Sequence, residues 1–228
     1  MTPHSNDRNL NSAPSQESRD KMRCLRNIVT ATAIFLVLFP TKLSYASERV
    51  SDWRFVDITG KKHAPFNSEK TKALVVVFIC TDCPIANYFQ PTLRDMAKKY
   101  ETQGVRFVMI HPDLECTRKE AKKHAMEYSI TIPIALDHKQ KMAKRLKAEF
   151  TPEAFVIAPQ GDVRYRGRIN DMYVSYGKKR HAPTRNDLDE AIEALLAGKE
   201  VVNPKTKPVG CPIFYPEANG TADLDARP

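Results

Sequence analysis

Hydrophobic residues form continuous runs of strand length in the central part of the chain. Residues 74–79 and 105–110 are almost entirely apolar, which predicts strands buried on both faces. Further strands are expected at residues 53–58, where polar and apolar positions alternate, and at residues 132–135, 154–157 and 163–167. The last two flank the turn Pro159-Gln160-Gly161-Asp162 and therefore predict a β-hairpin.

Apolar residues at helical spacing lie between these runs. They predict helices at residues 84–100, 117–128, 139–150 and 184–198. Pro91 lies inside the first helix and is expected to kink or split it. Thr117 and Glu120 have the spacing of a capping box, and Thr184 and Gly198 are expected to open and close the last helix. Residues 170–183 are predicted to form a polar loop.

The order of these elements predicts an α/β fold. Early strands alternate with helices, which favours parallel pairing, whereas the late hairpin is antiparallel. We therefore expect a central mixed β-sheet flanked by helices, in one domain that covers residues 47–199. Residues 200–228 contain many prolines and no periodicity, and they are expected to form an extended C-terminal tail.

The N-terminal residues 1–46 have the pattern of an extension followed by a signal peptide. Lys21, Arg23 and Arg26 precede the apolar residues 28–38, and Ser44-Tyr45-Ala46 supplies small residues for cleavage after Ala46. The apolar run is shorter than the ~20 residues of a membrane-spanning helix, so a cleaved signal is favoured over an anchor. Translation begins either at Met1 or at Met22. The protein is expected in the periplasm or outside the cell, and at the membrane only if the signal stays uncleaved.

The charge pattern argues against nucleic-acid binding. The 228 residues include 36 basic and 27 acidic side chains, a net charge of +9. Removal of residues 1–46 takes away six basic and three acidic residues and leaves a net charge of +6. Basic and acidic residues are interspersed, as in Arg118-Lys119-Glu120, which is typical of a solvated surface.

Two cysteines lie where the first buried strand meets the next helix. Cys80 and Cys83 form a Cys-x-x-Cys pair, and Pro84 suits the first position of a helix. A helix start carries partial positive charge, which favours a thiolate. The pattern favours thiol–disulfide exchange over a static structural disulfide or half of a zinc site.

The same region resembles a known family of exported bacterial redoxins. The resemblance rests on Thr81-Asp82-Cys83-Pro84-Ile85-Ala86-Asn87 and Thr151-Pro152-Glu153-Ala154-Phe155, and the family is that of alkyl hydroperoxide reductase and thiol-specific antioxidant proteins. It implies a thioredoxin-like fold, with Cys80 as the attacking thiol, Cys83 as the resolving thiol and Pro152 as a cis-proline facing them. It also implies a protein thiol or disulfide partner, or a peroxide substrate, and no cofactor or metal.

The sequence differs from both well-known branches of this fold. Thioredoxins have Trp before the first cysteine and Gly-Pro between the two, where this chain has Ile79 and Thr81-Asp82. Peroxiredoxins have Thr three residues before the reactive cysteine, whereas Thr81 lies two residues before Cys83. We therefore expect a thiol-disulfide oxidoreductase, with a thiol peroxidase as the alternative. The Asp82 carboxylate should disfavour a thiolate and make the dithiol a better reductant.

Other residues with reactive side chains leave alternatives open. Cys116 and Cys211 could form a structural disulfide, provide an accessory resolving thiol or stay free. His111, together with Cys80 and Cys83, could bind copper, which would make the protein a copper-binding chaperone. The remaining histidines, at positions 63, 124, 138 and 181, are expected on the surface or in loops.

Two features near the expected site have both a functional and a simpler interpretation. Glu153, next to Pro152, is either a proton relay to the dithiol or a polar edge residue. Tyr173, Tyr176 and the basic residues 178–180 form either a partner surface or a solvated loop.

Overall fold

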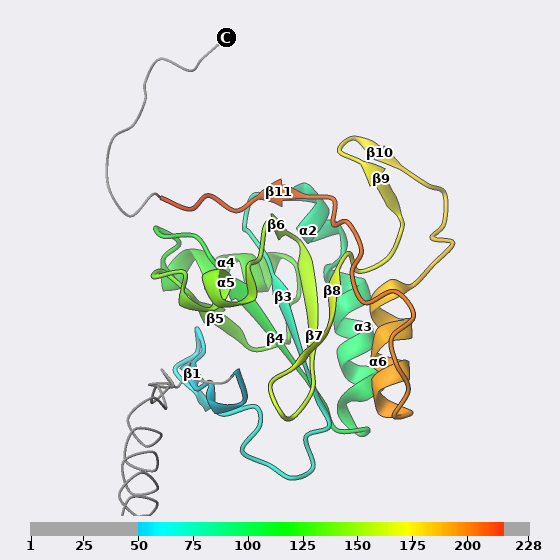
Figure 1. The fold of residues 1–228 in the computed structure, drawn as a ribbon. Helices are drawn as coiled ribbons and strands as arrows, with labels where there is room; N and C mark the ends of the chain where they lie inside the picture. The colour runs from blue at the N-terminus through cyan, green and yellow to red at the C-terminus, as the bar shows by residue number, and fades with distance from the viewer. Residues whose placement is uncertain (1–49, 217–228) are drawn as a thin grey trace, which may run out of the picture. The chain divides into compact units, whose positions relative to one another are not determined.

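The computed structural model describes residues 50–216, so the predicted signal peptide lies outside the described residues. A five-stranded sheet forms the centre, in the order β5-β4-β3-β7-β8 (Figure 1). Its strands are β3 (Ala73–Phe78), β4 (Val105–His111), β5 (Ile134–Leu136), β7 (Glu153–Ile157) and β8 (Val163–Gly167). Strands β3, β4 and β5 are parallel, whereas β7 and β8 are antiparallel to their neighbours. The predicted mixed sheet and hairpin are confirmed.

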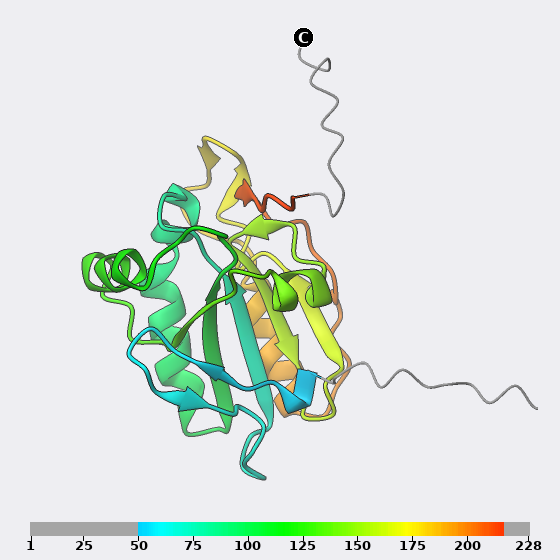
Figure 2. The same cartoon turned by 90° about the vertical axis from the view of Figure 1, so that its left-hand side faces the viewer.

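Both faces of this sheet are covered, which explains the unbroken apolar run of β3. All six residues of β3 are buried. On one face, α3 (Gln90–Glu101) and α6 (Asp187–Leu196) run side by side, and on the other lie α5 (Lys141–Leu146) and the segment that begins at η1 (Val50–Asp52) (Figures 1 and 2). Alternate residues of β3 point into the two resulting cores.

The helices largely follow the sequence pattern. Pro91 splits the first predicted helix into α2 (Pro84–Tyr88) and α3, as expected. Helix α4 (Arg118–Glu127) begins with the predicted capping box, in which Glu120 N–H donates to Thr117 Oγ1 and Thr117 N–H donates to the Glu120 carboxylate. Helix α5 is shorter than the predicted 139–150. Within residues 50–216, no helix has the length and apolar character needed to cross a membrane.

Several local predictions need correction. Thr184 does not cap α6, because Asp171 accepts hydrogen bonds from its N–H and hydroxyl groups, and α6 starts only at Asp187. The predicted polar loop contains a small hairpin of β9 (Tyr173–Ser175) and β10 (Lys178–Lys179). The predicted edge strand at residues 53–58 contributes β1 (Phe55–Val56), which pairs with β2 (Lys62–His63) outside the main sheet.

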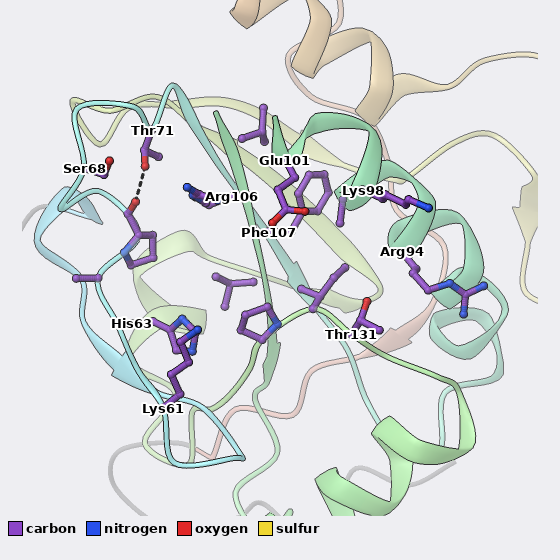
Figure 3. A pocket seen from close by; sticks show the side chains of 17 residues that line it. Lys61, His63, Ser68, Thr71, Arg94, Lys98, Glu101, Arg106, Phe107 and Thr131 are labelled. Atoms are coloured by element: carbon purple, nitrogen blue, oxygen red, sulfur yellow. Dashed lines mark hydrogen bonds between the residues drawn. The ribbon is translucent and has the colours of Figure 1, made fainter. Parts of the chain in front are cut away.

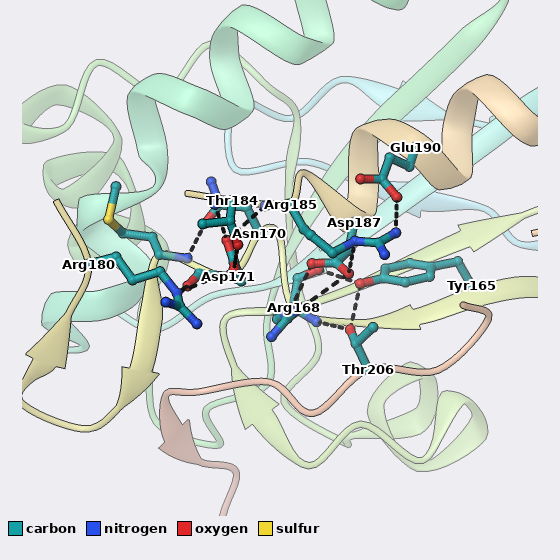
Figure 4. A network of polar contacts seen from close by, with 11 residues as sticks. Tyr165, Arg168, Asn170, Asp171, Arg180, Thr184, Arg185, Asp187, Glu190 and Thr206 are labelled. Carbon is teal, nitrogen blue, oxygen red and sulfur yellow. Dashed lines mark hydrogen bonds and ion pairs between the residues drawn. The ribbon is translucent and has the colours of Figure 1, made fainter. Parts of the chain in front are cut away.

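The C-terminal segment is extended but firmly attached to β8. Arg166 N–H donates to Pro204 O at 2.9 Å, and Thr206 N–H donates to Arg166 O at 3.0 Å. We call residues 204–206 the anchor. Its Thr206 hydroxyl closes a ring of hydrogen bonds with Tyr165 and Arg168, beside the Arg168–Asp187 ion pair (Figure 4).

Beyond the anchor, the chain crosses the sheet end that carries the dithiol. Residues 211 and 212 form β11 (Cys211–Pro212), which pairs antiparallel with β6 (Phe150–Thr151), as Figure 1 shows near α2. We call residues 210–215 the strap. Ile213 N–H donates to Glu149 O at 2.9 Å, and Tyr215 hydroxyl donates to Ala148 O at 2.6 Å.

Candidate active site

Cys83 is the buried member of the dithiol. It is the N-cap residue of α2, and its Sγ accepts a hydrogen bond from Ala86 N–H at 3.5 Å. The same thiol donates to the carbonyl oxygen of Thr151 at 2.9 Å. Because the side chain is fully buried and held at both ends, Cys83 is poorly placed to meet a large substrate first.

Cys80 is half-exposed and faces a pocket of about 340 Å³. The pocket lies between the segment that follows β4 and the strap. It is lined by Cys80, Pro112, Asp113, Leu114, Glu115, Gln140, Thr151, Cys211, Pro212, Ile213 and Phe214. Of the two thiols in the Cys-x-x-Cys pair, Cys80 is therefore the one that solvent and a substrate can reach.

The surroundings of Cys80 disfavour its thiolate. Burial raises the pKa of Cys80 above its ordinary value of 9.0, and the nearby Cys83, Asp82 and Asp113 raise it further. Only a hydrogen bond from the backbone of Asp82 acts in the opposite direction. Burial is the largest of these effects, and together with the two carboxylates it opposes the thiolate that a helix start would favour.

A buried polar contact fixes the loop between the two cysteines. Asn87 Nδ2 donates to Thr81 O at 2.8 Å, and Asn87 Oδ1 lies 2.7 Å from His124 Nε2. Since Oδ1 can only accept, His124 Nε2 carries the hydrogen. His124 is buried, which corrects its predicted surface position, and burial lowers its pKa.

Pro152 lies near the dithiol through its neighbour Thr151. The Thr151–Pro152 peptide bond is cis, and Thr151 receives the Cys83 thiol on its carbonyl oxygen. Strand β6, which ends at Thr151, is not free at this edge, because β11 places Cys211 opposite Thr151. A Cβ atom on Gly210 would lie 2.1 Å from Thr151 O, so the strap passes in close contact with this residue.

The two accessory cysteines occupy different places. Cys211 packs against the core cluster that contains Cys83, and burial together with the Cys83 thiol raises the pKa of Cys211 to about 12. Cys116 is buried just before α4, and burial with Asp113 and Glu120 raises its pKa to about 11. All four cysteines within residues 50–216 are free thiols.

His111 is enclosed within the protein. Its side chain is completely buried at the end of β4, both ring nitrogens lack a hydrogen-bond partner, and its ring centroid lies 5.3 Å from that of His124. Burial and the neighbouring His124 lower the pKa of His111 to about 3, so the ring is neutral at physiological pH. Among residues 50–216, no cluster of three or more His, Cys, Asp or Glu side chains could hold a metal ion.

Glu153 and Tyr173 both contact neighbouring side chains within the fold. Glu153 is buried, its Oε1 lies 2.7 Å from Arg166 Nη2, and its Oε2 accepts the Glu149 N–H at 2.6 Å. It is therefore neither an exposed edge residue nor free to relay protons. The Tyr173 ring packs edge-on against Tyr88, and Lys179 Nζ lies over the Tyr88 ring, 4.9 Å from its centroid.

A larger cavity, of about 800 Å³, lies at a different end of the molecule (Figure 3). It is lined by side chains from the β2 region, α3 and β4, among them His63, Arg94, Lys98 and Arg106. None of its lining residues has a buried polar side-chain atom without a partner, and no cysteine reaches it. Of these two cavities, the smaller one has cysteines in its lining.

Comparison with known proteins agrees with the fold. The sequence profile of the AhpC/TSA family matches residues 48–166, just over half of the chain. The chain belongs to the AhpC/TSA family. A search of the curated proteins gave no match. Family membership and the mixed sheet confirm the predicted thioredoxin-like fold.

Solved structures similar to this AhpC/TSA-family chain include two proteins without an assigned activity. A hypothetical protein from Sinorhizobium meliloti is 28% identical with a TM-score of 0.62, covering 72% of this chain and 91% of its own. An uncharacterized conserved protein from Geobacillus kaustophilus is 26% identical with a TM-score of 0.62, and the match covers 75% of this chain and 93% of that protein. A secreted disulfide oxidoreductase from Mycobacterium tuberculosis is 15% identical with a TM-score of 0.45, and the match covers 64% of this chain and 96% of that protein.

Several residues around Cys80 are not among those predicted from the sequence. Asp113 and Leu114 follow β4, and Cys80 follows β3. Because the carboxyl ends of parallel strands share one edge of a sheet, the position of Asp113 and Leu114 near Cys80 could have been predicted. Gln140 had no such signal. It is buried with a positive φ, and its Nε2 donates to Pro112 O at 3.1 Å and to Phe214 O at 2.6 Å. Only the folded chain brings these three residues together.

Proposed function

We propose that the protein is a thiol-disulfide oxidoreductase that acts through Cys80 and Cys83. The observation that carries this proposal is the division between a half-exposed thiol facing a pocket and a buried thiol behind it, at the start of α2. Cys80 attacks a substrate disulfide and forms a mixed disulfide, releasing the first substrate thiol. Cys83 then attacks Cys80, which releases the second substrate thiol and leaves a Cys80–Cys83 disulfide.

The charges around Cys80 support a role as a reductant. Burial, Asp82 and Asp113 all raise the pKa of Cys80, so the reduced site gains little from a stabilised thiolate. Strong oxidases of this fold rely on the opposite arrangement, in which the reduced form is stabilised. We expect a reduction potential below about −200 mV, and a value near about −120 mV would contradict the reductant role.

Reduction of insulin disulfides in the presence of dithiothreitol tests the function directly. The wild-type protein should accelerate the reaction, and Cys80→Ser should abolish it. In a separate reaction without dithiothreitol, pre-reduced Cys83→Ser should accumulate a mixed disulfide between Cys80 and the substrate, because the resolving thiol is missing. Cys116→Ser serves as the matched control, since this buried thiol lies outside the Cys-x-x-Cys pair. Equal activity of wild type and Cys80→Ser would refute the proposal.

A thiol peroxidase is the second candidate, because the family includes antioxidant proteins and the pocket beside Cys80 suits a small substrate. In that reaction Cys80 attacks a peroxide, becomes a sulfenic acid and is resolved by Cys83 with loss of water. Peroxide consumption coupled to a thiol donor distinguishes the two activities. Turnover of peroxide without reduction of insulin would favour the peroxidase.

We further propose that the protein acts outside the cytoplasm after cleavage behind Ala46. The basic residues, the short apolar run and Ser44-Tyr45-Ala46 support this proposal. Mass spectrometry of the exported protein should find an N-terminus at Ser47. Recovery of the intact N-terminus from the cytoplasm alone would contradict it.

A further inference from the structure

The strap lies where an extended substrate would pair with the active-site edge. β11 forms an antiparallel ladder with β6, with Cys211 opposite Thr151 and Pro212 opposite Phe150. Thr151 is also the residue whose carbonyl oxygen accepts the Cys83 thiol at 2.9 Å. Addition of a strand to an exposed edge is a common way for proteins to bind extended peptides. The chain therefore presents one of its own cysteines where a substrate cysteine would lie.

Three observations place Cys211 near the dithiol. Cys211 packs against the core cluster that contains Cys83, it shares the pocket lining with Cys80, and its backbone is in register with Thr151. Gly210 allows this approach, since any side chain there would meet Thr151 O and Pro152 N. Cys116 also belongs to this cluster, but it neither lines the pocket beside Cys80 nor pairs with Thr151. Its backbone carbonyl accepts from His138 Nε2 at 2.8 Å.

We propose that Cys211 is a third redox thiol of this site and forms a disulfide with Cys83. The proposal rests on the proposed function, because it uses the same dithiol. In the oxidised protein, the Cys211 thiolate attacks Cys83 within the Cys80–Cys83 disulfide. The Cys83–Cys211 bond forms, the Cys80–Cys83 bond breaks, and Cys80 leaves as a thiolate that takes up a proton, while Cys211 has lost one. The number of electrons is unchanged, so no further oxidant is required.

The consequence of this exchange is a free Cys80 in a protein that still holds one disulfide. Cys80 then faces its pocket again as a thiol, ready for a second substrate, while the strap is covalently fixed over β6. The anchor at residues 204–206 supports the exchange, because it holds the chain only a few residues from Cys211 and keeps the thiol at a high local concentration.

Disulfide mapping in Cys80→Ser tests the proposal. In this variant, diamide should accept the two electrons of Cys83 and Cys211, and peptide mass spectrometry should find the Cys83–Cys211 bond. Loss of the Cys83 thiol should be at least about tenfold faster than in Cys80→Ser/Cys211→Ser, because tethered thiols react at a high effective concentration. The matched control Cys80→Ser/Cys116→Ser should still form the bond. A Cys83 that stays reduced, or pairs with Cys116, would overturn the proposal.

The oxidised wild-type protein gives a second measurement that needs no variant. Partial oxidation should yield some chains in which Cys80 is alkylated and a Cys83–Cys211 bond is present. Their complete absence contradicts the proposal even if the Cys80→Ser variant fails to fold. The insulin assay separates the two ideas. If the wild type reduces insulin but forms no Cys83–Cys211 bond, the oxidoreductase proposal stands and the third-thiol proposal is wrong. If the wild type forms that bond but does not reduce insulin, the oxidoreductase proposal is wrong.

Discussion

The C-terminal segment contacts the domain at two places, the anchor and the strap, which differ in how deeply their contacts are buried. The anchor contacts β8 through buried polar groups: Tyr165 is fully buried, and its hydroxyl donates to Arg168 O at 2.6 Å and lies 2.7 Å from the Thr206 hydroxyl. The strap instead adds a short strand to an edge, and Phe214 within it is 75% exposed. The comparison indicates that the anchor belongs to the fold, whereas the strap belongs to the active site.

Two glycines make this difference testable. A Cβ atom on Gly167 would lie 2.2 Å from Thr206 Oγ1, and one on Gly210 would lie 2.1 Å from Thr151 O. The same substitution can therefore be made against the anchor and against the strap. The expected consequences differ because the anchor completes the hydrogen bonds of the fully buried Tyr165, whereas the strap adds a strand of two residues at an edge.

The largest effect is expected from Gly167→Ala. The residue has φ of 145°, which alanine rarely adopts, and its Cβ would push into Thr206. Overpacking combined with backbone strain should lower the free energy of unfolding by about 3 kcal/mol. Urea denaturation followed by circular dichroism measures this loss. A change no greater than that of Gly210→Ala would remove the distinction between anchor and strap.

A smaller effect is expected from Thr206→Val, which keeps the shape of the side chain but removes its hydroxyl. Tyr165 O–H donates to Arg168 O, so the Thr206 hydroxyl donates to Tyr165 and accepts the Arg168 N–H at 3.0 Å. Loss of both bonds should lower the free energy of unfolding by about 1–2 kcal/mol. Thr206→Ser retains the hydroxyl and should lie closer to wild type. The exposed Val202→Ala provides a control that should stay within about 0.5 kcal/mol.

Gly210→Ala should affect stability less and the thiols more. Release of the strap removes hydrogen bonds worth about 1 kcal/mol each but returns conformational entropy to several residues, so the net loss should stay below about 1 kcal/mol. Cys83, which the strap helps to cover, should react with a maleimide severalfold faster than in wild type. Unchanged Cys83 reactivity at unchanged stability would show that the strap tolerates the added methyl group in place.

The same contrast explains what could be predicted from the sequence. The buried run of β3, the split at Pro91 and the capping box at Thr117 each depend on neighbours in sequence, and the structure confirms them. Contacts between residues far apart in the sequence could not be predicted from local patterns. Thr184 looks like a helix cap until Asp171 binds it, and a surface position suited His124 until Asn87 paired with it.

The candidate site divides in the same way. The pair of cysteines before Pro84 marks the site on its own, because strand, dithiol and helix start are consecutive. The strap cannot be recognised as part of the site from the sequence. Its residues lie in a stretch without periodicity, and Cys211 pairs with β6 about sixty residues away. A strand of two residues is too short for any alternation to show.

The smallest effect concerns the charge between the two cysteines. The Asp82 carboxylate raises the pKa of Cys80, whereas its backbone hydrogen bond lowers it, so Asp82→Asn removes the unfavourable charge and keeps the favourable bond. Below its pKa, the thiolate fraction of Cys80 falls tenfold for each pH unit. Asp82→Asn should therefore increase alkylation of Cys80 by iodoacetamide at pH 7 by about a factor of two, the effect of one exposed charge.

The measurement needs a background in which Cys80 is the only reactive thiol. The protein used starts at Ser47 and so lacks Cys24. In it, Cys83, Cys116 and Cys211 are replaced by serine, and the alkylation rate is followed from pH 6 to pH 10. Because the pKa of Cys80 is raised, the rate should still be rising above pH 9, and Asp82→Asn should shift the curve toward lower pH. High salt should shrink the difference between the two proteins, since an exposed carboxylate is screened. A curve that levels off below pH 8 would mean that the helix start outweighs both carboxylates, and the expectation of a reductant would lose its electrostatic support.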